Sequence, residues 1–300
     1  MALVSYTSPM TYQDRFARAA GNLQIRATEG YRMLYLRHVV GERSLYSRSS
    51  RACMYNGQTA FYRSPSAHAQ IMELLAARPS HERRVLVVAG SIGCQPYTLA
   101  MMAANAGLDN VRIDTFDISH VFMRVAREGV YPVGALAGLP PELVRHFNIP
   151  ADGGYAAVSD DIKARVNFLP HSSLQKFKAD AQYDVVVAEN LLKHIYNNLA
   201  FSRGVKNIRH ARQNKQAAAI TQLCNLTRGY LFVDMVEETP FAFHRGRAPF
   251  NPFAEAGMVY LDARLQPFDG GVRYPTDEKD VVASIKKRDY IHALMKAPCL

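Results

Sequence analysis

A glycine-containing loop and an acid are spaced along the sequence as in a site for a ribose-bearing cofactor. The apolar run 85–89 leads directly into Gly90-Ser91-Ile92-Gly93, and Asp117 ends the alternating segment 111–117 that follows. Small residues at a strand-to-helix turn let the backbone approach a ligand closely and place it at a helix N-terminus. An acid after the following strand can accept hydrogen bonds from both hydroxyls of a ribose. The pattern indicates a dinucleotide or S-adenosylmethionine as ligand.

The glycine loop alone does not choose between these ligands. Residues 89–96 read AGSIGCQP, which does not match the GxGxxG sequence of a dinucleotide site. A purely structural turn in an ordinary α/β fold is the alternative explanation for the two glycines. The segments around the loop are therefore needed to distinguish a cofactor-binding loop from a structural turn.

Strand-like and helix-like segments alternate along most of the chain. A continuous apolar run predicts a strand over 85–89, and alternation of apolar and polar residues predicts one over 111–117. Further strands are expected over 166–169, 183–188 and 229–233. Helices are expected over 66–77, with Ser66 as N-cap, and over 97–106, 119–127 and 217–226. Strands that alternate with helices predict an α/β fold with a doubly wound, mostly parallel sheet.

The remaining segments suggest how the chain is divided. We expect a basic, helical N-terminal region over 1–80 and an α/β domain over 81–300. Within that domain, residues 131–165 are expected to form a small β subdomain, and residues 240–300 an extended C-terminal segment.

Composition narrows the class of protein. The chain has 36 Lys and Arg against 26 Asp and Glu, a formal net charge of +10. This charge suits nucleic acid, an anionic surface or an acidic substrate, and a merely solvated basic surface is the alternative explanation. No helix-turn-helix, RNP or zinc-finger signature is present, which disfavours nucleic acid. The four cysteines form no CxxC pair, so neither a metal site nor a redox motif is expected. No apolar stretch is long enough to span a membrane and no secretory signal is seen, so a cytoplasmic location is expected.

Several segments together resemble the chemotaxis receptor methyltransferases of the CheR type. The resemblance runs over about residues 55–235 in one order, and residues 143–147 and 166–174 continue it between the five segments that carry it most clearly. They are Thr59-Ala60-Phe61-Tyr62-Arg63, VLVVAGSIGCQPYTLA at 85–100, Phe116-Asp117-Ile118, Ala126-Arg127-Glu128-Gly129-Val130-Tyr131 and Glu189-Asn190-Leu191-Leu192.

This resemblance implies a class I Rossmann-like methyltransferase fold that binds S-adenosylmethionine and releases S-adenosylhomocysteine. Asp117 would hold the ribose, Ser173 and Leu174 would line the adenine, and Asn190 would lie near the methionine part. The full set of implied cofactor-binding residues is Ala89, Gly90, Ser91, Gly93, Gln95, Tyr97, Asp117, Ser173, Leu174 and Asn190.

Arg63 and His194 are the candidate catalytic residues. A carboxylate nucleophile is ionised at neutral pH and needs orientation rather than a base. Arg63 can orient it as a bidentate fork, although a surface charge is the alternative. His194 falls where the family carries an aromatic residue and could contact substrate or act as a base; a structural histidine is the alternative.

Three positions depart from the family pattern around the methionine end of the cofactor. The paired acids after the glycine are Cys94 and Gln95 here, and the arginine before Asn190 is Glu189. The acid expected to pair with the cofactor's amino group is therefore missing, and Gln95 could accept that hydrogen bond without a charge. Cys94 could carry a lowered pKa at a helix N-terminus, or simply be small and buried.

Because these departures lie near the methionine end of the cofactor and the substrate entrance, they favour a substrate other than a receptor glutamate. The first hypothesis is an S-adenosylmethionine-dependent methyltransferase that esterifies a small carboxylic acid, with a hydroxy fatty acid-derived quorum-sensing signal as one candidate. The alternative is CheR-like methylation of glutamate side chains in an acidic chemoreceptor. A non-catalytic cofactor-binding regulator and a nucleic-acid methyltransferase are weaker alternatives.

Overall fold

The computed structural model describes residues 59–77, 82–151, 154–189, 191–192, 195, 208–234, 252–261, 265 and 291–296. The expected N-terminal helical region lies outside these residues up to position 58, as does most of the segment 240–300. Among the described residues, no helix has the length and apolar character needed to cross a membrane.

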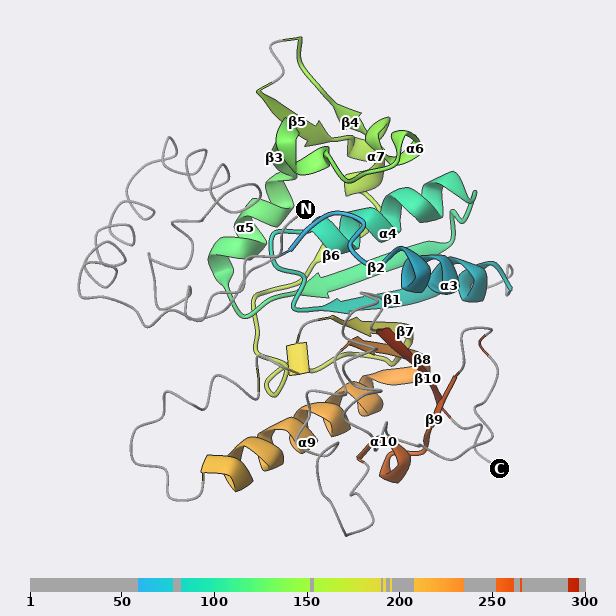
Figure 1. Ribbon diagram of the computed structural model, residues 1–300, viewed down its shortest axis with the longest axis vertical. Coiled ribbons are helices and arrows are strands. Elements are labelled where there is room, and N and C mark those ends of the chain that lie inside the picture. The colour runs from blue at the N-terminus through green and yellow to red at the C-terminus, as the bar shows by residue number, and fades with distance from the viewer. Residues whose placement is uncertain are drawn as a thin grey trace, which may run out of the picture.

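A seven-stranded sheet in the order β6-β2-β1-β7-β8-β10-β9 forms the centre of the molecule (Figure 1). Its first five strands are parallel neighbours. They are β6 (Val166–Phe168), β2 (Val111–Phe116), β1 (Arg83–Val88), β7 (Tyr183–Ala188) and β8 (Thr227–Asp234). Strands β10 (Ile291–Lys296) and β9 (Met258–Tyr260) continue the sheet in antiparallel fashion. The predicted α/β class with a mostly parallel sheet is confirmed.

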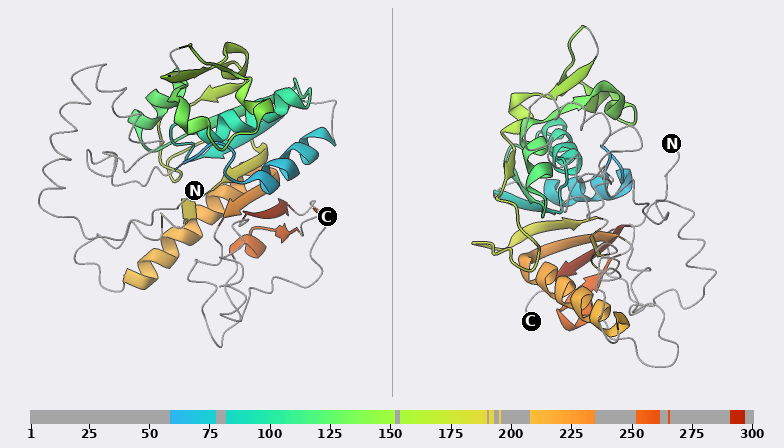
Figure 2. Two further views of the ribbon diagram at one scale, coloured as in Figure 1. Left: turned by 45° about the horizontal axis from the view of Figure 1, so that its top comes forward. Right: turned by 90° about the vertical axis from the view of Figure 1, so that its left-hand side faces the viewer.

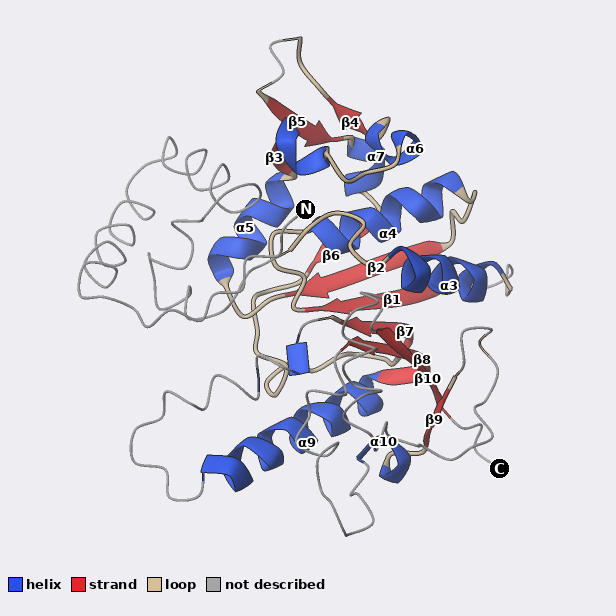
Figure 3. Cartoon of the chain, in the orientation of Figure 1, coloured by secondary structure: helices blue, strands red, loops and turns tan. Residues whose placement is uncertain are grey.

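Helices cover both faces of this sheet, as Figures 2 and 3 show. The longer ones are α3 (Pro65–Ala76), α4 (Cys94–Asn105), α5 (His120–Glu128) and α9 (Ile208–Leu226), and the short ones are α6 (Pro141–Val144), α7 (Asp160–Lys163), α10 (Pro252–Glu255) and the 3-10 turn η3 (Val133–Leu136). Val85 and Val87 of β1 belong to one hydrophobic cluster, while Leu86 and Val88 belong to another. Because successive strand residues point to opposite faces, a continuous apolar run is what a strand buried on both sides requires.

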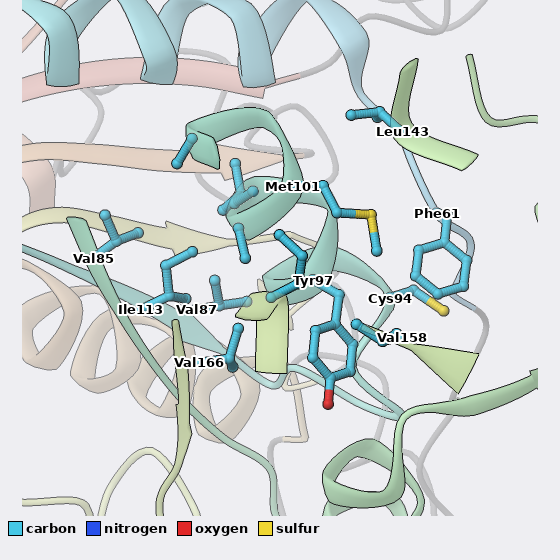
Figure 4. Packing of buried hydrophobic residues seen from close by; sticks show 14 of the residues in the cluster. Phe61, Val85, Val87, Cys94, Tyr97, Met101, Ile113, Leu143, Val158 and Val166 are labelled. Atoms are coloured by element: carbon cyan, nitrogen blue, oxygen red, sulfur yellow. The ribbon is translucent and has the colours of Figure 1, made fainter. Parts of the chain in front are cut away.

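The cluster on the α4 face packs aromatic and aliphatic side chains against β1 and β2. Figure 4 shows Tyr97 and Met101 of α4 beside Val87 and Ile113 of the strands. The cluster on the other face joins α9 to β7 and β8. Each face therefore has its own core, and the sheet is fixed between them.

A separate three-stranded antiparallel sheet, in the order β3-β5-β4, lies beyond α5. Its strands are β3 (Val130–Pro132), β4 (Phe147–Asn148) and β5 (Tyr155–Val158). The Tyr131 hydroxyl donates to the Ile92 carbonyl at 2.6 Å, and the Phe61 ring meets Tyr131 edge-on at 4.9 Å. The small sheet thus braces the loop that follows β1.

Some element limits differ from the sequence predictions. Helix α3 begins at Pro65 after Ser64, so Ser66 is not its N-cap; proline is well suited to a first helical position because its missing N–H is not needed there. Helix α9 begins at residue 208, nine positions before the predicted start at 217. Strands β9 and β10 were not predicted, and they place part of the segment 240–300 inside the sheet.

Candidate functional site

The loop between β1 and α4 has an unusual backbone. Ala89 and Ser91 lie in the left-handed region, at φ 58° and 51°, and Gly93 caps α4 at φ 96°. A non-glycine residue held in this region costs of the order of 1–3 kcal/mol and persists only where its surroundings impose it. Gly90 N–H donates to the Phe116 carbonyl at 3.1 Å, which ties the loop to the end of β2. The predicted ligand loop is therefore a strained turn at the carboxyl edge of the sheet.

Packing on the protein side of the loop accounts for both glycines. A Cβ on Gly90 would lie 2.1 Å from Thr115 Oγ1, and one on Gly93 would lie 2.9 Å from the Tyr131 hydroxyl oxygen. These contacts leave no room for a methyl group. Gly90 and Gly93 thus fix the path of the loop at the candidate site.

Asp117 lies buried at the end of β2 and binds the same loop. Its Oδ2 accepts from Ser91 N–H at 3.0 Å, and its Oδ1 accepts from Ser119 N–H at 2.8 Å. Burial raises the pKa of this carboxyl to about 6, although the backbone donors act in the opposite direction. A carboxylate oxygen can accept more than one hydrogen bond, so both oxygens keep capacity for ribose hydroxyls.

The segment after β6 closes against Asp117. Ser172 N–H donates to the Asp117 carbonyl at 2.9 Å, which brings Ser173 to the expected adenine side. Leu174 is buried in the core with Phe116 and Phe177. Its contribution to the adenine side is therefore mainly to anchor this segment.

Ile118 is a candidate contact that the sequence reasoning did not select. It directly follows Asp117 and is 38% exposed, although most large apolar side chains of the described residues are covered. An exposed apolar side chain beside the acid expected to hold the ribose suits an adenine face. Ile118 could have been selected from the sequence, because it belongs to the segment Phe116-Asp117-Ile118 that resembles the family.

Tyr97 was predicted to bind the cofactor, and its position in the structure does not agree with that role. Its side chain is fully buried, and its hydroxyl donates to the Ala126 carbonyl at 2.8 Å. Its ring meets Phe168 at 5.4 Å within the core. Tyr97 therefore joins α4 to α5 beneath the loop and does not present its side chain to a cofactor.

Two polar atoms of the loop region fit a ligand. Ser91 Oγ and Gln95 Nε2 are shielded from solvent and have no hydrogen-bond partner within the described part of the chain. Leaving such groups unsatisfied costs free energy, so a polar ligand that bonds them would be stabilised there. Together with Asp117 and the strained turn, these atoms match a nucleoside cofactor with a polar tail.

Arg63 and Glu189 meet at the same edge of the sheet. Arg63 Nη2 donates to Glu189 Oε2 at 2.8 Å, and the Glu189 side chain is only 2% exposed against 31% for Arg63. Glu189 directly follows β7, so the β1–β7 register carries it to the level of Ala89. The acid that replaces the family's arginine is therefore held in the candidate site.

His68 lies behind this pair. Its Nε2 is 3.9 Å from Glu189 Oε1, which is too long for a hydrogen bond. Burial lowers the pKa of His68, so the ring is neutral at neutral pH. Glu189 Oε1 has no hydrogen-bond partner among the described residues.

Cys94 is not a reactive thiol. It is fully buried at the first position of α4, and burial raises the pKa of its thiol to about 12. Of the two possibilities for Cys94, the structure shows the small, buried residue and not the lowered pKa, because desolvation outweighs the nearby positive charge of Arg63. Asn190 and His194, the other residues expected near the reacting centre, lie outside the described residues.

The sheet order, the turn after β1 and the acid after β2 define a Rossmann-like α/β fold of the class I methyltransferase type. Residues 57–200 match the family described as CheR methyltransferase, SAM binding domain. This segment is a divergent CheR-type domain, and its cofactor is S-adenosylmethionine.

Known relatives agree with this family. The chain is 29% identical over 168 residues to a chemotaxis protein methyltransferase of Vibrio parahaemolyticus, covering 52% of this chain and 61% of that protein. It is 30% identical over 129 residues to chemotaxis protein methyltransferase 1 of Pseudomonas aeruginosa, covering 40% and 47%. The chain thus matches about half the length of these relatives.

Among solved structures, magnesium protoporphyrin IX methyltransferase from Synechocystis PCC 6803 with bound SAM is similar at a TM-score of 0.39 and 14% identity, covering 96% of this chain and 98% of that one. CalS10, an amino pentose methyltransferase from Micromonospora echinaspora, is similar at a TM-score of 0.38 and 12% identity, covering 81% and 95%.

Proposed function

We propose that this protein is an S-adenosylmethionine-dependent carboxyl methyltransferase that acts on glutamate side chains of an acidic protein, as the names of its relatives suggest for chemotaxis. The match of residues 57–200 to the CheR domain carries the proposal. The net charge of +10 favours an acidic protein partner through electrostatic complementarity. The family match favours this hypothesis over esterification of a small carboxylic acid.

The site residues have distinct proposed roles. Asp117 accepts hydrogen bonds from the ribose hydroxyls, while Ser173 and Ile118 border the adenine. Ser91 Oγ and Gln95 Nε2 supply further hydrogen bonds to the cofactor. Asn190 is proposed to lie near its methionine part.

When bound, S-adenosylmethionine supplies an electrophilic methyl group on a sulfonium. The attacking carboxylate is already ionised at neutral pH, so no side chain has to remove a proton. The task of Arg63 is to orient that carboxylate in line with the methyl group. His194 is proposed to contact the acceptor.

Transfer of a tritiated methyl group tests the reaction and the acceptor class. The protein is incubated with labelled S-adenosylmethionine and either membranes that carry chemoreceptors or a lipid extract, and methanol released by mild base is counted. Base-labile counts in the receptor protein are expected. Counts in the lipid fraction alone would overturn the protein-substrate proposal, and bound cofactor without methanol in either fraction would overturn carboxyl methylation.

A further inference from the structure

The cofactor's amino group lacks the acid that the family places after the loop glycine. Cys94 and Gln95 occupy those positions, and neither carries a negative charge: the thiol stays protonated and the amide is neutral. An alkylammonium group taken out of water without a counter-charge is strongly disfavoured. A second acid near the loop would remove this cost.

Glu189 lies where that acid is needed. Strand β1 pairs with β2 on one side and with β7 on the other, so the loop after β1 lies between Asp117 and Glu189. Neighbouring strands are about 4.8 Å apart, which separates the ends of β2 and β7 by roughly 10 Å. A ligand whose ribose lies at Asp117 can extend its amino acid tail across the loop to the end of β7.

The two oxygens of Glu189 have different surroundings. Oε2 accepts the hydrogen bond from Arg63, which fixes the orientation of the carboxylate. Oε1 is shielded from solvent and has no hydrogen-bond partner among the described residues, with His68 Nε2 too distant to donate. The carboxylate is thus held by one oxygen and presents a second, unsatisfied acceptor.

We propose that Glu189 is a cofactor-binding residue whose Oε1 accepts a hydrogen bond from the ammonium group of S-adenosylmethionine. It replaces, from the end of β7, the charge that Cys94 and Gln95 do not supply at the start of α4. Arg63 holds the Glu189 carboxylate in place through its hydrogen bond to Oε2, which leaves Oε1 for the cofactor. This inference rests on the proposed cofactor site and adds a residue to it.

The test measures binding of two ligands by titration calorimetry. S-Adenosylhomocysteine carries the amino group, and its desamino analogue has hydrogen in its place. In the native protein the desamino ligand is expected to bind at least ten-fold more weakly. In Glu189→Gln, which keeps an acceptor for Arg63, S-adenosylhomocysteine is expected to weaken at least ten-fold and the desamino ligand less than three-fold.

The outcomes separate this inference from the proposed function. Equal weakening of both ligands in Glu189→Gln, or unchanged binding of S-adenosylhomocysteine, would overturn the role of Glu189 while leaving the cofactor site in place. No binding of either ligand to the native protein would overturn the site itself.

A second variant covers a failure of Glu189→Gln to fold. Glu189→Asp keeps the charge that Arg63 pairs with and shortens the side chain by one carbon. In this variant the ratio of the affinities for S-adenosylhomocysteine and its desamino analogue is expected to fall at least three-fold. An unchanged ratio would contradict the proposal. Glu128→Gln, on the separate helix α5, is the matched control and is expected to bind both ligands as the native protein does.

Discussion

Arg63 and Glu189 form an ion pair at 2.8 Å although 126 positions separate them in the sequence. The carboxylate is buried and the guanidinium is partly exposed. The pair joins the segment before α3 to the end of β7, at the same edge of the sheet as the loop after β1 and Asp117.

Removing Arg63 should destabilise the fold because it leaves Glu189 buried without its cation. We expect Arg63→Ala to lower the free energy of unfolding by about 1.5–3 kcal/mol, the range for a hydrogen bond between charged groups. The double variant with Glu189→Gln should lose less than the sum of the single changes. Urea unfolding of the four proteins measures this coupling.

The exposed pair Arg112–Glu82, at 3.8 Å, is the control for this cycle. Arg112→Ala should change the free energy of unfolding by less than about 1 kcal/mol, as is usual for surface pairs. An additive result for Arg63 and Glu189 would show that their contact contributes nothing to stability.

Asp117 should make stability depend on pH in an unusual direction. Its pKa is about 6 in the fold against 3.8 for an unperturbed aspartate, so the folded chain binds more protons than the unfolded chain between these pH values. The contribution of Asp117 to the free energy of unfolding therefore falls as pH rises from about 4 to 6, by about 3 kcal/mol at 1.36 kcal/mol per pKa unit. The side chain in Asp117→Asn cannot ionise, so this variant should lack the pH-dependent contribution of Asp117 to the free energy of unfolding.

The measurement is the difference in unfolding free energy between Asp117→Asn and the native chain at pH 4.5 and pH 6.5. The variant should gain stability relative to the native chain as pH rises. A difference that stays constant with pH would show that the Asp117 pKa is the same in the folded and unfolded chains.

Gly90 should be required by packing against Thr115. The Thr115 hydroxyl donates to the Val87 carbonyl at 2.9 Å, so it cannot move away without loss of that bond. Gly90→Ala is expected to cost about 1–3 kcal/mol as an overpacked site. Part of this cost should disappear when Thr115→Ala is added.

Gly138→Ala is the matched control, since a Cβ there would meet nothing within 4 Å. Its free energy of unfolding should stay within about 0.5 kcal/mol of the native value. If Gly90→Ala is as stable as this control, the close approach of Thr115 does not constrain the loop.

The parallel core of the fold could be predicted because its strands are buried on both faces. The runs 85–89 and 185–188 are continuously apolar and of strand length, the pattern that a strand buried on both faces requires. Strands β9 and β10 are short, and their pairing with each other and with β8 joins distant segments. Nothing local in their sequences specifies that pairing.

The candidate site was only partly predictable. The position of Asp117 follows from the end of a strand, so spacing alone could locate it. The side chain of Tyr97 could not be assigned, because a motif position does not give the direction in which a helix residue points. Glu189 was recognised only as a departure, since its pairing with Arg63 depends on tertiary contact.

The most direct test of the central claim is calorimetric titration of S-adenosylhomocysteine into the native protein, Asp117→Ala and the control Arg145→Ala in the small β subdomain. One ligand is predicted to bind per chain. Affinity should fall at least ten-fold in Asp117→Ala and stay unchanged in Arg145→Ala. Equal affinity in all three proteins, or no binding to the native chain, would contradict a cofactor site at the ends of β1, β2 and β7.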